Sequence, residues 1–576
     1  MDKKDYFLNP AAAQHRHYEA LRTIHVEGVP LEQAARKFKL SPAYLKKLNG
    51  QFHRRFAAGE DPFFPPPPKG RKKGRATAPA LVEQIVALRK KNHSVPDIRA
   101  LLAATQNDIS LATIGNILKQ EGFAPLPKRT RQERAGAALP KSIQAPQSAP
   151  IQWANETFTT EHAGGPMVFL PLLERLGVAP ALKRAGFPKT AVLSDTASLL
   201  SFLALKLLGN ERLSHDAPYN MDRALGLFAG LNVLPKNSTL SSYSYRCTRE
   251  HNRALLLEMS RMFTDAEQGE FNLDFKAIPH WGEQSVLENN WAGMRGRGIK
   301  SLLALLVEDP ATGFLSYADA GIRHRNESDA VLEFVDFWKQ GRGAAPKLLV
   351  FDSRFTTYEN LSNLNRDGIA FLTLRRRGKK IVTEAQAVPQ DRWQTVTFEA
   401  DGRKRRTVRV CDSLISLRHY EGEVRQIILT GHGHKHPAFL ISNDTQAPVE
   451  VLLKKYARRW LVEQEIAEQV SFFHLNSPSS SIVVKVDFDL TLSLLAHNLF
   501  RVLTGMLPGF ERCTVDTIAR DVLQNAATVS IENRAITVRL KKKTHLPTLF
   551  ELPWMKERTA LSWMEASIAY ETATSS

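Results

Sequence analysis

Helical periodicity and short apolar runs divide the chain into segments with different predicted elements. In residues 14–56 the apolar positions recur at helical spacing, and Ser41-Pro42 offers an N-cap and a first-turn proline before the last helix. A second segment of this kind covers residues 79–128, where Ser110 precedes another amphipathic run. We therefore predict two small all-helical units, each with the helix-turn-helix pattern.

Residues 156–265 have a pattern that predicts helices throughout, with the apolar stretch 191–208 as a buried helix. The pattern changes after residue 266. Apolar runs bounded by turn residues predict strands at 270–275, 299–307, 313–319, 347–351 and 369–374, and helices at 328–339 and 357–366. Three strands followed by helix, strand, helix and strand is the order of an RNase H-like α/β domain. In that fold the first and fourth strands are neighbours.

Alternating apolar and polar positions between residues 381 and 447 predict a β-rich insertion, and helix resumes from 448 to 474. Polar, proline-rich stretches mark the linkers. The chain is thus expected to be multidomain, with helix-turn-helix-like units at 1–60 and 79–128, linkers at 61–78 and 129–155, a helical domain at 156–265, an RNase H-like core at 266–380 and 448–510, the insertion at 381–447 and a C-terminal region at 511–576.

The charge of the chain indicates which class of partner it binds. The 576 residues carry a formal net charge of +19, and the first 150 hold 26 basic and 12 acidic side chains. Such an asymmetry favours a polyanion such as DNA, because lysine and arginine neutralise phosphates. A basic, well-solvated surface or binding to a membrane surface would give the same balance. Three widely spaced cysteines, no long uninterrupted apolar stretch and no signal-like start indicate a protein of the reducing cytoplasm.

The predicted DNA-binding side chains lie in the first helical unit and in the linker after it. The capped second helix would carry Tyr44, Lys46, Lys47 and Asn49 toward a major groove. A small helical bundle without a DNA role is the alternative. The linker follows a run of prolines with five basic residues in seven, and such a segment can lie along phosphates or enter a minor groove: Lys69, Arg71, Lys72, Lys73 and Arg75.

Three carboxylates have the setting of a metal-binding triad. Asp274 lies in a short apolar run, Asp352 ends another, and Glu463 lies in a long helical segment. Two strand-borne aspartates and a helix-borne glutamate can hold a pair of divalent cations that activate a nucleophile and stabilise the leaving oxygen of a phosphodiester. Aspartates at strand ends more often cap a turn, so the prediction depends on the three together. The alternates are Asp319, Asp444, Glu465 and Glu468.

The arrangement resembles the DDE transposases of bacterial insertion sequences, in the branch with a β-strand insertion before the final glutamate. That branch has a helix signature of Tyr, two residues, Arg, three residues, Glu, six residues, Lys. Tyr456, Arg459 and Glu463 match it in type and spacing, whereas Val470 stands where the family has lysine. The next polar side chain on that stripe would be His474. The resemblance covers roughly 160–545 and includes Leu234–Leu240 and Lys485–Leu499.

This resemblance implies Asp274, Asp352 and Glu463 as the catalytic and metal-binding residues, with two Mg²⁺ ions that Mn²⁺ can replace. It implies nicking of DNA at the element's ends, followed by transesterification of the freed 3′-hydroxyl into target DNA. Tyr456 and Arg459 would position phosphates. A homodimer on double-stranded DNA is expected, in the bacterial cytoplasm near the nucleoid. Four cations beside the Asp401-Gly402 turn would clamp the DNA backbone, a solvated turn being the alternative: Arg403, Lys404, Arg405 and Arg406.

Two other functions fit the same sequence. A transposase-derived protein without catalysis would bind DNA and not cut it, and Val470 is the feature that favours this alternative. A host nuclease of the RNase H fold would cut DNA without joining it. Loss of cleavage with retained binding in Glu463→Gln is expected of the transposase and of the nuclease.

Overall fold

The chain forms two compact units, residues 1–79 and 80–576, in this computed structural model. The structure describes residues 7, 9–10, 12–59, 63, 79–90, 93, 95, 98–99, 102, 109–123, 147–216, 218–264, 269–279, 287–292, 296–355, 357–400, 404–433, 436–478 and 482–573.

The described residues 12–59 of the first unit form a bundle of three helices, over the segment 14–56 that the sequence predicts to be helical. Its helices are α2 (Ala13–His25), α3 (Leu31–Lys37) and α4 (Pro42–Ala57). The Ser41 side chain accepts a hydrogen bond from the Tyr44 N–H, which is the predicted N-cap. Leu21, Ala35 and Leu45 are fully or almost fully buried where the three helices meet. The apolar spacing of this segment therefore serves a small core of its own.

The second helical segment contains α5 (Pro79–Lys90) and α7 (Leu111–Gln120). Ser110 caps α7 by accepting from the Thr113 N–H, again as predicted. Unlike the first bundle, this segment belongs to the large unit. Val86 packs with Tyr245 and Ile482, and the Lys90 ammonium lies 4.5 Å from the centroid of the Tyr245 ring.

The expectation that residues 156–265 are all helical is wrong at its start. Glu156–Thr160 is a strand, β1, that pairs antiparallel with β12 (Ala527–Glu532). Five residues with alternating burial are too few to predict a strand from sequence, and the partner strand lies more than 350 residues away along the chain. β1 completes a five-stranded sheet of order β1-β12-β13-β15-β14, with β13 (Ala535–Leu540), β14 (Thr559–Leu561) and β15 (Ala566–Thr572).

The rest of that segment is helical. The stretch predicted to be a buried helix is α12, and its residues are buried almost throughout. The helices are α9 (Gly164–Val168), α10 (Leu170–Arg175), α11 (Val178–Arg184), α12 (Asp195–Leu207), α13 (Arg223–Phe228), α14 (Asn237–Ser244) and α15 (Arg249–Phe263).

A mixed sheet of ten strands forms the centre of the large unit. The predicted strands are present as β2 (Glu270–Pro279), β4 (Arg297–Asp309), β5 (Phe314–Ile322), β6 (Leu348–Phe351) and β7 (Ala370–Leu374). β5, β4, β2, β6 and β7 lie in that spatial order, with β2, β6 and β7 parallel to one another. β3 (Asn289–Ala292), which the sequence analysis did not predict, pairs with β4. The predicted helices are α16 (Ala330–Arg342) and α17 (Tyr358–Arg366).

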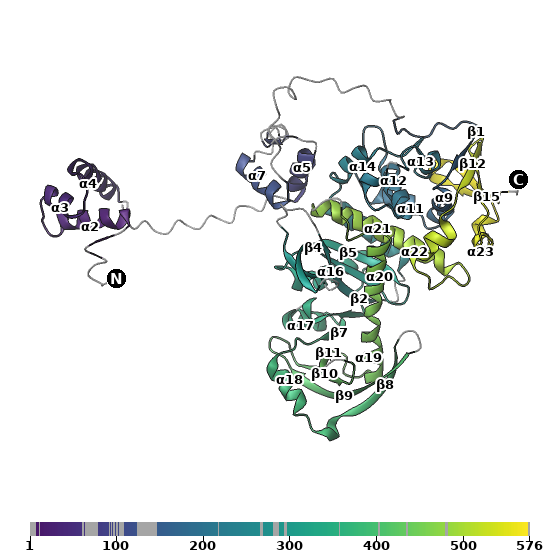
Figure 1. The fold of residues 1–576 in the computed structure, drawn as a ribbon. Coiled ribbons are helices and arrows are strands. Elements are labelled where there is room, and N and C mark those ends of the chain that lie inside the picture. The colour runs from purple at the N-terminus through teal and green to yellow at the C-terminus, as the bar shows by residue number, and fades with distance from the viewer. Residues whose placement is uncertain are drawn as a thin grey trace. The chain divides into compact units, whose positions relative to one another are not determined.

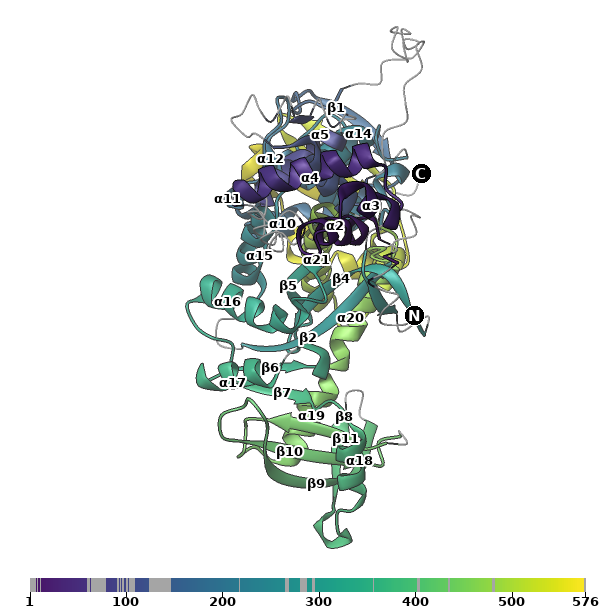
Figure 2. The same ribbon diagram turned by 90° about the vertical axis from the view of Figure 1, so that its left-hand side faces the viewer.

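The insertion extends this sheet. After α18 (Lys379–Gln386), its strands are β8 (Gln394–Ala400), β9 (Lys404–Ser416), β10 (Glu423–Thr430) and β11 (Ala438–Ser442). β11 pairs antiparallel with β7, so these four strands continue the central sheet at one edge. Figure 1 shows them in green below β7, and Figure 2 shows the succession from β4 to β9.

The predicted helix from 448 to 474 is two helices that meet at Arg459. α19 is Val449–Arg458 and α20 is Trp460–Ser471. At the junction the Arg459 N–H donates to Tyr456 O and the Val462 N–H to Arg459 O, both three residues apart. α20 ends at Ser471, and His474 follows with a positive φ of 55°.

The long helix α21 (Val483–Gly505) passes through the core and packs on β5, α15 and α12. Among the described residues, no single helix is long and apolar enough to cross a membrane. The pair 164–175 and 178–184, bent by 70°, has the length and hydropathy only when taken together, and most of its apolar side chains are buried. The remaining short helices are α22 (Val515–Ile518) and α23 (Leu546–Leu549).

Candidate active site

The pairing of β2 with β6 brings two of the predicted carboxylates together. Glu270 lies opposite Leu348 and Asn272 opposite Val350, so paired residues differ by 78 in number. Asp274 and Asp352 differ by the same 78, and Asp352 directly follows the last residue of β6. The continued register therefore places Asp352 beside Asp274. Each carboxylate accepts a backbone N–H from the next residue, at 2.8 Å for Asp274 and 2.6 Å for Asp352.

Arg459 links the third carboxylate to this pair. Its Nη1 lies 3.5 Å from Asp274 Oδ2, and its Nη2 donates to Glu463 Oε1 at 2.9 Å. The Arg459 side chain is 16% exposed, Asp274 21% and Glu463 53%. Glu463 thus lies at the mouth of the site, with Asp274 and Arg459 behind it.

The electrostatics of the site reflect this crowding of carboxylates. The pKa of Asp274 is raised to about 6, first by burial and then by Glu463 and Asp352, while Arg459 and the Phe275 N–H oppose the shift. Burial by itself would lower the pKa of Arg459, but Tyr456, Asp274, Glu463 and Asp352 together raise it well above its ordinary value. Arg459 is therefore a permanent cation among four acidic groups.

Tyr456 lies beside the guanidinium. The Arg459 carbon Cζ is 5.8 Å from the centroid of the Tyr456 ring. Burial, together with smaller contributions from Asp352 and Asp274, raises the pKa of Tyr456 to about 12, while Arg459 opposes the shift. The structure therefore brings together the five residues predicted from the strand ends and the helix signature.

Several contacts fix α19 and α20 on the face of β2 that carries Asp274. The Asn272 amide donates to Arg458 O at 3.1 Å and to Glu308 Oε2 at 3.0 Å. Lys455 forms an ion pair with Glu270 at 2.6 Å. On the opposite face of β2, Phe271 packs edge-on against Trp338 of α16, with ring centroids 4.5 Å apart. Even-numbered side chains of β2 therefore face the site.

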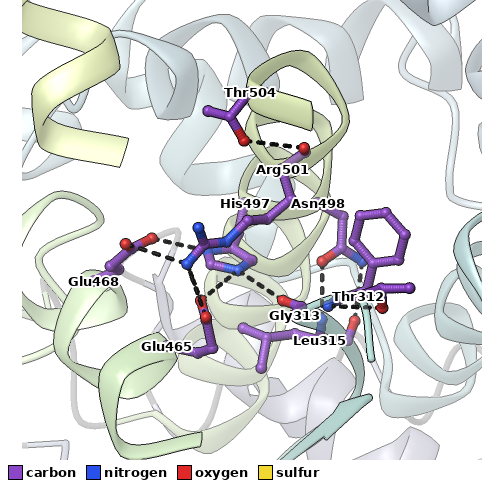
Figure 3. A network of polar contacts seen from close by, with 10 residues as sticks. Thr312, Gly313, Leu315, Glu465, Glu468, His497, Asn498, Arg501 and Thr504 are labelled. Atoms are coloured by element: carbon purple, nitrogen blue, oxygen red, sulfur yellow. Dashed lines mark hydrogen bonds and ion pairs between the residues drawn. The ribbon is translucent and has the colours of Figure 1, made fainter. Parts of the chain in front are cut away.

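Glu465 and Glu468, the competitors of Glu463, lie in a separate buried network with His497 and Arg501 of α21 (Figure 3). His497 Nε2 is 3.0 Å from Glu465 Oε2, and Arg501 Nη2 is 2.7 Å from Glu465 and 3.2 Å from Glu468. Ligand atoms of the two glutamates and His497 lie within 4.8 Å of one another, so among the described residues they could hold a metal ion. The Arg501 guanidinium already pairs with both carboxylates, and the network joins α20 to α21.

The alternate aspartates are used elsewhere. Asp319 forms an ion pair with Arg249 at 2.9 Å, and Arg249 also binds Asp487 of α21 at 2.7 Å. Asp444 caps a turn by accepting from the backbone N–H groups of Gln446 and Ala447 at 3.0 and 2.9 Å. The contacts of Asp319 and Asp444 are with residues other than Arg459. This favours Asp274 and Asp352 as the site residues.

Val470 occupies the position at which the helix signature has lysine, and its side chain makes apolar contacts. Val470 is half-buried and packs against the large core. His474 was expected on the same helical stripe, and this expectation is wrong because α20 ends at Ser471. His474 Nε2 lies 3.0 Å from Gly209 O. Neither residue offers a fixed positive charge to the site.

Lys276 is a site residue that the sequence analysis missed. It lies two positions after Asp274 in β2 and is half-buried. Burial lowers the pKa of its ammonium, and Asp274 opposes this effect. A lysine in the middle of a strand is unremarkable in sequence; alternation from Asp274 was the available signal.

The predicted DNA-binding side chains of the first unit differ in their exposure. Tyr44 is 44% exposed, and Lys46 and Lys47 are exposed on α4. Asn49 is instead bonded to His25 Nε2 of α2 at 2.7 Å, so part of its hydrogen-bonding capacity holds the bundle together. The linker candidates lie outside the described residues: Lys69, Arg71, Lys72, Lys73 and Arg75.

The cations predicted beside the insertion turn are described in part. Arg403 lies outside the described residues, and Lys404 begins β9. Arg405 and Arg406 are exposed and pair in register with Glu399 and Phe398 of β8. These two arginines are on a hairpin far along the sheet from β2, at its β8–β9 edge.

A cavity of about 410 Å³ opens next to Asp352. Its lining combines polar residues with apolar ones and includes Ser353, Tyr358, Arg376 and His419. Arg376 Nε donates to Ser353 O at 3.2 Å, immediately after Asp352. The cavity begins at the residue after Asp352, and its described lining includes none of the five site residues.

Comparison with known proteins gives no family for this chain. No protein-family model matches the sequence, and no curated protein matches it.

Proposed function

We propose that this chain is a DDE transposase, a metal-dependent enzyme that nicks DNA at the ends of a mobile element and joins the 3′-hydroxyl to target DNA. The observation that carries the proposal is the convergence of Asp274, Asp352 and Glu463. These carboxylates come from two strands and a helix, are far apart in sequence, and lie around a single arginine. A carboxylate with a perturbed pKa, gathered with other carboxylates at a strand edge, is typical of catalytic sites.

The topology supports an RNase H-like assignment of the core. The strand order β5-β4-β2-β6-β7, with β2 antiparallel to β4 and parallel to β6, is the order expected for that fold. The continuation of the sheet by β8–β11 before α19 and α20 fits the branch with a β-strand insertion before the glutamate. A fold alone does not define an activity, so the proposal depends on the site.

The three carboxylates fit a divalent cation. They offer only oxygen donors, which Mg²⁺ and Mn²⁺ prefer. Asp274 is half-buried next to Glu463 and Asp352, and its pKa is raised first by burial and then by these two carboxylates. A bound cation would offset both effects. Asp274, Asp352 and Glu463 would hold the metal, which when bound activates water and stabilises the leaving oxygen.

The protein's own side chains position the DNA. The Arg459 guanidinium can grip two phosphate oxygens, and it is held in place by Asp274, Glu463 and the Tyr456 ring. Water attacks the phosphodiester and releases a 3′-hydroxyl. That hydroxyl then attacks a target phosphodiester, so one bond forms as another breaks and no ATP is consumed.

DNA recognition is assigned to the N-terminal helical units. The first carries Lys46 and Lys47 on the exposed side of its capped helix α4. The excess of 14 positive charges in residues 1–150 favours binding to phosphates. The partner is double-stranded DNA, both the element's ends and the target, and a homodimer follows from the need to join two ends.

Two alternatives are separated from this proposal by experiment. Val470 favours a DNA-binding protein without catalysis, and a host nuclease would use the same carboxylates. Labelled duplexes from both flanks of the gene are incubated with Mg²⁺ and either the wild type or Glu463→Gln. Nicking by the wild type and binding without nicking by the variant would support the active-site assignment. Unaltered cleavage by Glu463→Gln would overturn it, and binding without cleavage by the wild type would favour the inactive alternative.

A further inference from the structure

Lys276 lies on the same face of β2 as Asp274. The β2–β4 ladder runs without interruption from Asn272 to Pro279, so side chains alternate strictly between the two faces. Asn272 contacts the backbone of Arg458 and Asp274 contacts Arg459, which identifies the even-numbered face as the one covered by α19 and α20. Lys276 is the next residue on that face.

Beyond Leu273, β2 has no paired strand on its β6 side among the described residues. β6 pairs with β2 over Glu270–Asn272 and ends at Phe351, level with Leu273 in the continued register. β2 continues to Pro279 with β4 as its neighbour on one side. Lys276 thus lies just beyond the carboxylate pair, where β6 no longer covers the strand.

The Lys276 ammonium is half-buried, and the Asp274 carboxylate acts on it electrostatically without forming a direct contact. Lys276 forms no ion pair or hydrogen bond within the part of the chain that the structure describes. Lys206 and Lys455 differ in this respect: Lys206 pairs with Asp489 at 2.9 Å, and Lys455 pairs with Glu270 at 2.6 Å. An ammonium withdrawn from water without a directly bonded anion is unfavourable, and an anion brought by a ligand would relieve this.

We infer that Lys276 is a phosphate-binding residue of the site, where its ammonium holds a non-bridging oxygen of the DNA phosphate placed at Asp274. This inference rests on the proposed function. It deepens that proposal because the helix signature lacks its lysine: Val470 packs against the core, and the cation is supplied from β2 instead. Arg459 approaches the DNA phosphate from the junction of α19 and α20, and Lys276 would approach it from β2.

The test compares Lys276→Gln and Lys276→Arg with the wild type in single-turnover nicking of the flanking duplexes with Mg²⁺. Lys276→Gln is expected to lower the rate roughly 100-fold, the usual effect of removing one electrostatic contact to a reacting group. Lys276→Arg should recover most of the rate because it restores the charge. Lys339→Gln is the matched control, since Lys339 of α16 is already paired with Asp367 at 2.6 Å outside the site, and its rate should stay close to the wild type.

A second readout separates phosphate binding from a purely structural role. A duplex with a neutral methylphosphonate at the scissile position removes the charged oxygen, so the wild type and Lys276→Gln should then differ far less. Equal rates of the wild type and Lys276→Gln on normal DNA would overturn the inference and leave the proposed function standing. So would a defect of Lys276→Gln that persists undiminished on the methylphosphonate. Failure of the wild type to nick normal DNA would overturn the proposed function itself.

Discussion

Arg459 joins Asp274 of β2 to Glu463 of α20, with Nη1 3.5 Å from Asp274 Oδ2 and Nη2 2.9 Å from Glu463 Oε1. The residue lies at the junction of α19 and α20, where the tight turn brings its side chain over the strand. A helix and a strand that carry candidate catalytic carboxylates are thereby joined by one guanidinium.

Replacing Arg459 should therefore impair chemistry. Arg459→Ala is expected to lower single-turnover nicking by roughly 100-fold or more, as for other preorganised electrostatic groups. Arg459→Lys should also be impaired, because an ammonium lacks the planar fork that contacts both carboxylates. The measurement is the nicking rate at saturating protein. Full activity of Arg459→Lys would contradict a role that depends on the guanidinium.

Asp274→Asn should separate metal binding from folding. The substitution removes a buried carboxylate that is close to Glu463 and Asp352, so the metal-free protein should be at least as stable as the wild type. Millimolar Mg²⁺ should raise the melting temperature of the wild type, because a ligand that binds only the folded state stabilises it. The variant should not respond. An equal response of both proteins, measured with EDTA as the reference, would place the metal elsewhere.

Glu308 predicts a pH dependence of stability. Burial, with smaller contributions from Glu465 and Asp309, raises its pKa from 4.5 to about 8, although the Asn272 amide opposes the shift. The pKa of Glu308 in the folded protein lies above its value in the unfolded chain. The contribution of Glu308 to the free energy of unfolding is therefore highest below about pH 4.5 and falls as the pH rises to about 8. Glu308→Gln should be more stable than the wild type at pH 8 by about 2 kcal/mol.

Melting curves between pH 5 and 8.5 measure this difference. The gap between Glu308→Gln and the wild type should widen as the pH rises. Glu421→Gln serves as the control, because Glu421 is 75% exposed in its pair with Arg366. A gap that stays constant over the range would show that Glu308 is not protonated in the folded protein.

The network in Figure 3 predicts a large structural effect at Arg501. Arg501→Met leaves Glu465 and Glu468 buried without their shared guanidinium, which should cost about 3–5 kcal/mol of stability. Because the network anchors α20, nicking should also fall at temperatures where the variant remains folded. Thermal denaturation is the measurement. A melting temperature equal to that of the wild type would mean that the two glutamates find another partner.

Lys46 and Lys47 should contribute to DNA affinity through phosphates. Lys46→Ala and Lys47→Ala are each expected to weaken binding to duplex DNA and to reduce the slope of log affinity against log salt by about 1. Asn49→Ala should instead loosen the contact between α4 and α2, since Asn49 bonds His25. Fluorescence anisotropy at several salt concentrations distinguishes these effects. Unchanged slopes for both lysine variants would remove α4 from the DNA interface.

Local pattern was sufficient to predict the elements that carry the site. The apolar run before Asp352 and the run around Asp274 are strands because their side chains are buried in the sheet. The pairing of these strands was predicted only from the order of elements, since the register is a long-range property. Glu156–Thr160 shows the opposite case, where a short alternation gave no signal until its distant partner was known.

Two details of the site could not be read from sequence. The helix signature suggests one continuous stripe, whereas the turn at Arg459 and the end of α20 at Ser471 remove His474 from it. Lys276 becomes notable only when the faces of β2 are known and its lack of a partner is visible within the described residues. Both depend on tertiary packing.

The most direct test of the central claim is a strand-transfer assay with Mg²⁺, DNA from both flanks of the gene and a supercoiled target plasmid. The wild type is compared with Asp352→Ala, whose fold is checked by its melting curve. Joined products that form with the wild type and disappear in the variant are the predicted result. Joining that persists in Asp352→Ala would contradict the assignment of the carboxylate site, and nicking by the wild type without any joined product would identify a nuclease instead.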